Sequence, residues 1–437
     1  MTQNEKMVQE EKFQLNNPKV INAWAMFDWA NSVYYLIIST AIFPVYFTGI
    51  VDDRLSILGL SFTDTSLLAF CITSVYLVLA FFSPILSGIA DYGGNKKLFL
   101  LVFTFMGSIA CTCLWGFQGM DTIWIGIGGY ALATIGAAGG LVFYNAFLPE
   151  IVSEDRYDAV SARGFAFGYI GSVILLVINL IMIEKYEVFG FSDKAAASRI
   201  AFVTVGLWWM GFAQYTIRNL PGSTAPKPIW KTIGKGYAEI RKVVRALKGQ
   251  ADLKNFLMSF LFYNAGVQTV IYMATVFADK ELHFETADLI LLVLLIQLIG
   301  AVGAYFFAWI SRIYRNKIAL TATLLIWLAI CVFASFVADK AQFYIIGMLV
   351  GLVLGGVQSL SRASYAKIIP RQTTDTTSYF SFYDVVEKCS IVIGTFSFGI
   401  IENITGSMRM SALALGIFFL TGIVLLWRVH FRTETSA

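Results

Sequence analysis

Charged side chains lie within two apolar runs of this chain, where a charge costs about 3 kcal/mol unless it is paired or hydrated. Arg362 is in one run, and Asp384, Glu387 and Lys388 are in the next. Asp384 and Lys388 are four residues apart and would share a helical face. Glu387 is then available to Arg362 on a neighbouring helix. The four residues would form either a structural or gating latch, or a site that binds substrate or a proton directly, and both interpretations remain open.

Asp28 is a further candidate for gating or ion coupling. It lies in the first apolar run beside Trp24 and Trp29, and no basic residue occurs within four positions of it. It is a helix-end residue at the membrane boundary, a gate residue or a proton carrier. Among the acids in apolar runs, we rank Asp28 first as a proton carrier, because Asp384 and Glu387 have basic neighbours.

Amide and phenol groups in other apolar runs can form hydrogen bonds with a small polar solute. The candidate substrate contacts are Tyr35, Asn145, Tyr263, Asn264, Gln268, Gln297 and Gln358, together with Arg362 for a carboxylate. Asn264 and Gln268 are four residues apart and would share a helical face. The alternative role for any one of these side chains is a hydrogen bond between helices. A set that is polar but mostly uncharged favours a neutral or zwitterionic solute.

The sequence lacks the residue patterns that common enzymes and metal sites require. The five cysteines lie inside apolar runs, and the two histidines lie near the ends of such runs without a second ligand at a suitable spacing. No Gly-Lys-Ser or Gly-Lys-Thr nucleotide loop occurs, and no Ser-His-Asp arrangement stands out. We therefore expect no metal, no cofactor and no enzymatic activity. A net charge of +4 without a basic patch also argues against a nucleic-acid partner.

Long apolar segments must position these residues. Of the 437 residues, 57% are hydrophobic and 14% are charged, which leaves too little polar surface for a water-soluble protein. A membrane-spanning helix needs about 20 mostly apolar residues. Twelve such spans are predicted, at about residues 25–49, 66–90, 97–117, 122–148, 163–184, 199–217, 254–278, 286–310, 317–337, 341–367, 379–402 and 408–428. We therefore expect an all-α membrane protein in a lipid bilayer.

The twelve spans fall into two similar halves. An offset of 220 or 221 residues relates three pairs of landmarks, which are Asp91 and Ser311, Lys96 and Lys317, and Pro149 and Pro370. A repeated offset favours a duplicated six-span unit. The expected parts are a cytoplasmic N-terminal segment 1–24, an N-terminal six-helix bundle 25–217, a cytoplasmic central loop 218–253, a C-terminal six-helix bundle 254–428 and a cytoplasmic tail 429–437.

The distribution of basic residues predicts the orientation. Most of the 32 Lys and Arg residues fall in segments on the same side as the N-terminus, with a concentration between Arg218 and Lys254. Because cytoplasmic loops carry an excess of Lys and Arg, both termini and the central loop should be cytoplasmic. The latter part of that loop, GYAEIRKVVRALKG, is either an amphipathic helix on the membrane surface or a solvated linker helix.

Particular segments in both halves carry a family resemblance. They are AWAMFDWANSVYYLIISTAIFPVYF from residue 23, YNAFLPEI from residue 144, SARGFAFGYIGS from residue 161, FLFYNAGVQTVIYMATVFA from residue 260 and GGVQSLSRASYAKIIP from residue 355. Together they resemble the major facilitator superfamily, and within it the bacterial permeases related to the fungal vacuolar amino-acid effluxer of autophagy. The turn after the second span, with Asp91, Gly94 and Lys96, resembles the loop motif of the superfamily. Ala265 departs from the pattern, because many relatives have an acidic residue there.

The resemblance implies a major facilitator fold with two pseudo-symmetric six-helix bundles. It implies that spans one, four, seven and ten line a central cavity, and that Asp91 forms a latch with Lys96 and Lys97 at the inner face. The implied function is secondary transport of a small polar solute, such as amino acids, by alternating access. The expected location is a bacterial cytoplasmic membrane. Protons are the candidate coupling ion, and a monomer is the expected state. The alternatives are a sugar or drug-like solute, or a non-transporting sensor or scaffold on the same fold.

Overall fold

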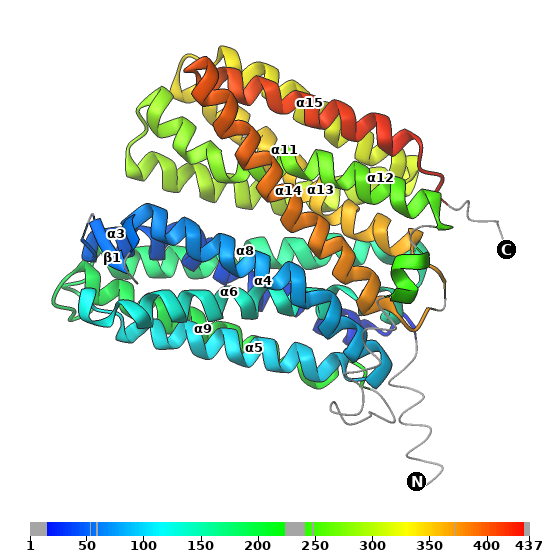
Figure 1. The fold of residues 1–437 in the computed structure, drawn as a ribbon, viewed down its shortest axis with the longest axis horizontal. Coiled ribbons are helices and arrows are strands. Elements are labelled where there is room, and N and C mark those ends of the chain that lie inside the picture. Colours follow the sequence, from blue (N-terminus) through cyan, green and yellow to red (C-terminus); the bar gives the residue numbers. More distant parts are fainter. Residues whose placement is uncertain are drawn as a thin grey trace, which may run out of the picture. The chain divides into compact units, whose positions relative to one another are not determined.

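The protein is almost entirely helical, as the sequence predicts (Figure 1). The structure is a computed structural model, and it describes residues 15–52, 54–57, 60–222, 241–246, 249–371 and 373–431. The chain divides into two compact units. The first comprises Met1–Phe147 and Phe167–Ala238, and the second comprises Leu148–Ala166 and Glu239–Ala437. The expected limits of the two bundles stay a prediction.

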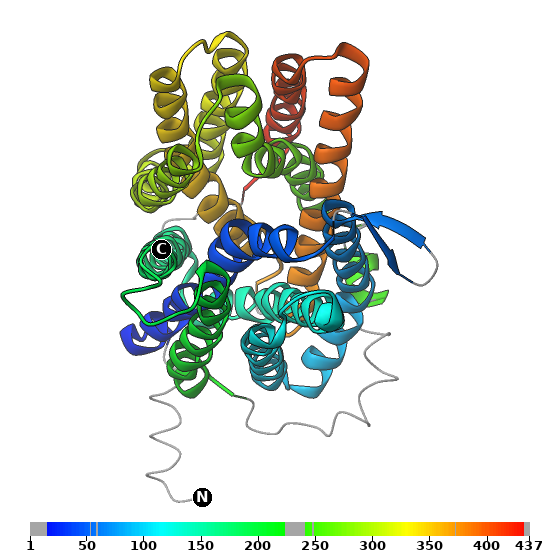
Figure 2. The same cartoon turned by 90° about the vertical axis from the view of Figure 1, so that its left-hand side faces the viewer.

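The first unit contains five long helical segments, one of them interrupted, and most of a sixth. They are α2 (Pro18–Val33) continued by the π-helix η1 (Tyr34–Ile42) and α3 (Phe43–Ile50), α4 (Asp64–Gly93), α5 (Lys96–Cys113), α6 (Ile123–Asn145), α8 (Tyr157–Glu184), which begins in the second unit, and α9 (Lys194–Asn219). Short 3-10 turns η2 (Leu114–Gly116) and η3 (Met120–Thr122) lie between α5 and α6. The strands β1 (Arg54–Ile57) and β2 (Leu60–Thr63) pair antiparallel, with Arg54 opposite Thr63, in a hairpin that projects from the helices (Figure 2).

Local sequence explains where the first long helix starts and where it changes from an α-helix to a π-helix. Its start at Pro18 precedes the expected span, because Asn17 caps the helix by accepting a hydrogen bond from the backbone N–H of Lys19 at 2.9 Å. Further along, the helix widens into η1 just before Pro44. Proline has no backbone N–H and clashes with the carbonyl four residues earlier, so the α-helical hydrogen bond that position 44 would donate is not made, and the turn before it is widened.

The second unit contains the remaining long helices. They are α11 (Ala251–Leu282), α12 (Thr286–Phe336), α13 (Lys340–Ile368), α14 (Thr376–Thr405) and α15 (Met408–Trp427). The unit also holds the short helix α7 (Leu148–Ile151), the 3-10 turn η4 (Glu154–Arg156) and the start of α8. Residues 241–246 of the predicted surface or linker helix are helical, with Val243 buried, and 236–240 with 247–248 lie outside the described residues.

The helices fit a membrane environment. Among the described residues, ten helices are long and apolar enough to span a bilayer. That number counts α12 once, although Arg315 has φ 69° and ψ 157° and separates two helices there. It also omits α14, which carries the charges at Asp384, Glu387 and Lys388. Large apolar side chains such as Phe81 and Ile417 are exposed, as lipid-facing residues are. The count is consistent with twelve spans.

A lysine at the start of a helix binds the end of the last helix in each unit, although the first unit uses Lys97 and not Lys96, the residue that the predicted repeat pairs with Lys317. In the first unit, Lys97 Nζ donates to the carbonyl of Leu220, just past the end of α9, at 2.8 Å. In the second unit, Lys317 Nζ donates to the carbonyls of Trp427 and Val429 at the end of α15, at 2.7 and 3.0 Å. A cation is favourable at a helix C-terminus, where carbonyl groups lack intrahelical partners.

Small residues bring neighbouring helices into backbone contact. In the second unit, a Cβ at Gly355 of α13 would lie 1.9 Å from the carbonyl oxygen of Gly300 on α12. In the first unit, a Cβ at Gly136 of α6 would lie 2.3 Å from the Cα of Gly107 on α5. Glycine is therefore required at these crossings, as is common between helices in membranes.

Candidate functional site

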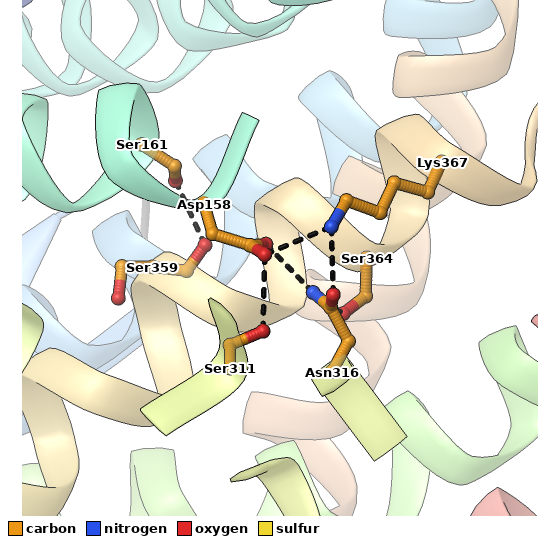
Figure 3. A network of polar contacts seen from close by, with 7 residues as sticks. All are labelled: Asp158, Ser161, Ser311, Asn316, Ser359, Ser364 and Lys367. Carbon is orange, nitrogen blue, oxygen red and sulfur yellow. Dashed lines mark hydrogen bonds and ion pairs between the residues drawn. The ribbon is translucent and has the colours of Figure 1, made fainter. Parts of the chain in front are cut away.

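A buried polar network surrounds Asp158, at the start of α8 in the second unit (Figure 3). Asp158 Oδ2 accepts hydrogen bonds from Lys367 Nζ at 2.8 Å and from Ser311 Oγ at 3.0 Å. Asp158 Oδ1 accepts a third from Asn316 Nδ2 at 2.7 Å. Asn316 in turn accepts from Lys367 Nζ at 2.7 Å and donates to Ser364 Oγ at 3.0 Å. The side chains of Asp158 and Lys367 are only 9% and 15% exposed, so this is a largely desolvated ion pair.

The network joins three helix ends that are far apart in the sequence. Asp158 comes from the start of α8, Ser311 and Asn316 flank the break in α12, and Lys367 comes from the end of α13. One negative and one positive group are present, and three neutral groups supply further hydrogen bonds. A buried ion pair is stable only when its remaining lone pairs and protons are satisfied in this way.

A second set of contacts ties the same segment to α13. Arg362 donates from Nε to Ser161 Oγ at 2.9 Å and from Nη2 to the Ser161 carbonyl at 2.8 Å. Its guanidinium lies 4.2 Å from the ring centroid of Phe165, and Ser161 Oγ donates to the carbonyl of Ser359 at 2.8 Å. The segment Leu148–Ala166 is therefore held by α12 and α13, and we call it, with Ser311, Asn316, Arg362 and Lys367, the latch.

Two more exposed contacts extend the latch at its edges. Glu154 accepts from Arg371 at 2.7 Å, and Thr376 Oγ1 at the start of α14 donates to Glu150 Oε1 at 2.7 Å. The Arg371 side chain is 60% exposed. These edge contacts therefore contribute less stability than the buried pair.

A polar cluster links α11, α13 and α14 within the second unit. Tyr263 and Ser361 share a hydrogen bond between hydroxyl groups at 2.7 Å. Asn264 Nδ2 donates to Ser390 Oγ at 2.5 Å, and Gln268 Nε2 approaches Glu387 Oε1 at 3.4 Å. Three of the predicted substrate contacts therefore lie together on α11, and each has a partner on α13 or α14.

Asp384 and Lys388 form an ion pair on one face of α14, as their four-residue spacing predicts. The contacts of Arg362 described above are with Ser161 and Phe165. The expected contact between Arg362 and an acid of α14 stays a prediction, as does the role of each candidate site residue.

The other predicted residues lie in several places. Gln297 on α12 has a buried Oε1 without a hydrogen-bond partner among the described residues, and Gln358 on α13 is half-buried. In the first unit, Asn145 ends α6 and Tyr35 packs edge-on against Tyr34 at 5.6 Å.

Of the predicted gating residues of the first unit, Asp91 and Lys96 lie at helix ends and Asp28 lies within α2. Asp28 is buried and accepts a hydrogen bond from Tyr144 OH at 2.7 Å. Asp91 lies in the last turn of α4, and Lys96 begins α5 with its Nζ 5.2 Å from the ring centroid of Phe147.

Sequence reasoning missed Asp158, Ser161 and Lys367. The partners of Asp158 are 153 to 209 residues away along the chain, so no local spacing indicates the network. Asn316 had a signal, because the repeat offset of 221 residues relates it to Asn95 in the turn after the second span. Asp158 itself lies in a short polar stretch that resembles an ordinary connection between two spans.

Replacing Arg315 with glycine should raise the free energy of unfolding by about 1 kcal/mol, because its backbone conformation is one that is essentially restricted to glycine. Arg315 has φ 69° and ψ 157°, and its side chain is exposed. Thermal unfolding in detergent measures the change. Arg312→Gly, in the helical part of α12, is the matched control and should lower stability by about 1 kcal/mol. A destabilised Arg315→Gly variant would contradict the assignment of strain.

Comparisons with known proteins agree with this geometry. The model of the family described as "Vacuole effluxer Atg22 like" matches residues 16–436. A Bacillus subtilis (strain 168) protein described as "Uncharacterized MFS-type transporter YxiO" is 30% identical over 418 residues, which cover 95% of this chain and 96% of that protein. Autophagy-related protein 22-1 of Penicillium rubens is 24% identical over 472 residues, covering 86% of this chain and 77% of that protein.

Solved structures establish the fold. The major facilitator superfamily transporter FucP in its outward conformation matches with a TM-score of 0.71 and 14% identity, over 96% of this chain and 99% of that one. The proton:xylose symporter XylE matches with a TM-score of 0.67 and 11% identity, over 94% and 95%. The expected major facilitator fold is therefore confirmed.

Proposed function

The chain belongs to the family of proteins like the vacuole effluxer Atg22, and we propose that this transporter of the major facilitator type moves small zwitterionic solutes, amino acids first among them, by alternating access. The observation that carries the proposal is the polar cluster of the second unit. Phenol, amide and hydroxyl groups lie there on the same helices as Arg362, Glu387 and the Asp384–Lys388 pair. A zwitterion needs both a cationic and an anionic partner, together with neutral hydrogen-bonding groups.

The latch gives this site a conformational control. Helix α8 starts in the second unit and continues into the first. A rotation of one unit relative to the other therefore exerts a force on the first turns of this helix. The buried Asp158–Lys367 pair, with its neutral partners, favours one arrangement of that segment. We assign the latch the task of stabilising one of the two access states, which transport must then open.

A direct test uses purified protein in proteoliposomes. Counterflow of labelled neutral amino acids, with labelled sugars in parallel, should show exchange of amino acids and none of sugars. A matched variant, Gln268→Leu, removes one amide of the cluster and should weaken the apparent affinity by about tenfold, because a buried polar site loses one hydrogen bond. Exchange of sugars alone, or of neither class, would reject the amino-acid proposal.

The proposal also includes an orientation, with both termini and the 218–253 loop in the cytoplasm of a bacterial cell. In a cysteine-free background, a cysteine at position 340, at the start of α13, should react with a membrane-impermeant thiol reagent in intact cells. A cysteine at position 235, which lies outside the described residues, should react only after permeabilisation. Labelling of position 235 in intact cells would overturn the orientation.

A further inference from the structure

Glu387 differs in its contacts from Asp384, the acid one turn before it on α14. Among the described residues, its carboxylate has one hydrogen bond, from Gln268 Nε2 at 3.4 Å, which is long for this interaction. The hydroxyl of Ser390 donates to the backbone carbonyl of Glu387 at 2.6 Å and not to the carboxylate. The side chain is half-buried, so a proton can reach it.

The charged and titratable groups around Glu387 are engaged elsewhere. On α14 itself, Asp384 and Lys388 pair with each other, and Tyr383 stacks on Phe260 with ring centroids 4.2 Å apart. On α13, Arg362 binds Ser161 and lies over Phe165.

Among the described residues, the helices α11 and α15, which pack against α14, carry their charged side chains at their ends. Helix α11 contributes the neutral amides of Gln268 and Asn264. The basic residues of α15, Arg409 and Arg428, lie at its two ends. Glu387 is therefore a carboxylate in the interior of a membrane protein without a direct ion pair among the described residues.

We propose that Glu387 is the proton-binding residue that couples solute movement to the proton gradient, an inference that rests on the proposed transport function. The carboxylate binds one proton from one side of the membrane and becomes a neutral carboxylic acid, and it releases the same proton to the other side. Binding removes the negative charge while that charge is out of water, which is favourable because an uncompensated charge is costly there. Gln268 suits both states, since its amide can donate to the carboxylate and can accept from the acid.

The geometry favours a proton over a metal cation. Alkali and alkaline-earth cations need several oxygen ligands. At Glu387 the hydrogen bonds place one carboxylate and the amide of Gln268, which are fewer oxygen ligands than such a cation needs. Within the part of the chain that the structure describes, a single carboxylate with amide donors around it does not form a cation cage.

This assignment replaces Asp28 as the first candidate for proton coupling. Asp28 is only 5% exposed and accepts a hydrogen bond of 2.7 Å from Tyr144 OH. A buried carboxylate that already accepts a short hydrogen bond is less accessible to an incoming proton than one with a long contact. Glu387 receives only the longer amide contact and is more accessible.

Infrared spectroscopy of the purified protein tests the proposal without any solute. As the pH is lowered from about 9 to about 6, a range in which exposed carboxylates keep their charge, wild type should gain a carbonyl-stretching band of a protonated carboxylic acid. Glu387→Gln should lose most of that band, whereas Asp28→Asn and Asp384→Asn should keep it. A band that persists in Glu387→Gln, or a wild type without a titrating band, would overturn the proposal. Glu387→Asp covers a failure of the glutamine variant to fold, because its band should shift in frequency and not vanish.

Two further arms separate the possible causes of failure. Repeating the titration in sodium chloride and in choline chloride should give the same curve, and a band suppressed by sodium would identify a sodium site instead. The counterflow screen is scored independently of the infrared result. Amino-acid exchange without a titrating Glu387 rejects the coupling proposal alone, and a titrating Glu387 without amino-acid exchange rejects the proposed substrate alone.

Discussion

Replacing Asp158 with alanine should lower the free energy of unfolding by about 3 kcal/mol, because it leaves the buried ammonium group of Lys367 without its counter-charge. The pair is formed at 2.8 Å, and the two side chains are 9% and 15% exposed. Ser311 and Asn316 would lose an acceptor in the same variant. Thermal and denaturant unfolding in detergent micelles measures the effect.

The edge of the latch supplies a matched control. Glu154→Ala removes the pair with Arg371, whose side chain is 60% exposed, and should cost less than about 1 kcal/mol. The double variant Asp158→Ala with Lys367→Met should recover part of the loss, since no buried charge remains. Equal losses in Asp158→Ala and Glu154→Ala would show that the buried network contributes no special stability.

Replacing Arg362 should reduce transport by about 100-fold, and a lysine should not rescue it. Within the latch, Arg362 contacts Ser161 and Phe165. It is also adjacent to Ser361, which shares a hydrogen bond with Tyr263 of the polar cluster. Truncating one partner of a buried, hydrogen-bonded charge costs about 3 kcal/mol. That free energy corresponds to a loss of transport of about 100-fold. Lysine carries a single ammonium group and cannot reproduce donation from two guanidinium nitrogens.

Flux measurements with the solute identified in the counterflow screen, alongside thermal unfolding, give the required comparison. In both Arg362→Ala and Arg362→Lys, the loss of solute flux should be larger than the loss of thermal stability accounts for. Arg371→Ala, near the end of the same helix, removes an exposed arginine and should leave transport within about threefold of wild type. Normal transport by Arg362→Ala would show that this residue belongs neither to the latch nor to the solute site.

The sequence predicts the helices well because lipid imposes one dominant rule. A spanning segment must be long, apolar and helical, so composition alone indicates α4, α6 or α15. Helix boundaries and strained residues depend on single backbone groups, and composition does not predict them. The start at Pro18, seven residues before the expected span, rests on the capping residue Asn17, and the strained backbone at Arg315 leaves no compositional trace.

The candidate site was predictable where its residues share one helix. Asn264 and Gln268 are a turn apart, so spacing alone places them on one face, and the Asp384–Lys388 pair follows from the same rule. Contacts between helices carry no such spacing. Asp158 contacts Ser311, Asn316 and Lys367 only because tertiary packing brings the start of α8 to the break in α12 and the end of α13.

The continuity of α8 across the two units has a mechanical consequence. The unit boundary falls after Ala166, and Asp158 lies about 13 Å before it at 1.5 Å per residue. A hydrogen-bonded helix transmits rotation like a rigid lever arm, so a turn of about 15°, the size of known rigid-body rotations, displaces the far end by about 3 Å. The hydrogen bonds of Asp158 are 2.7 to 3.0 Å long and lose their strength over a smaller displacement. If α8 turns as one rigid piece with the first unit, such a rotation breaks all of these hydrogen bonds together, and the network then behaves as a switch with two positions.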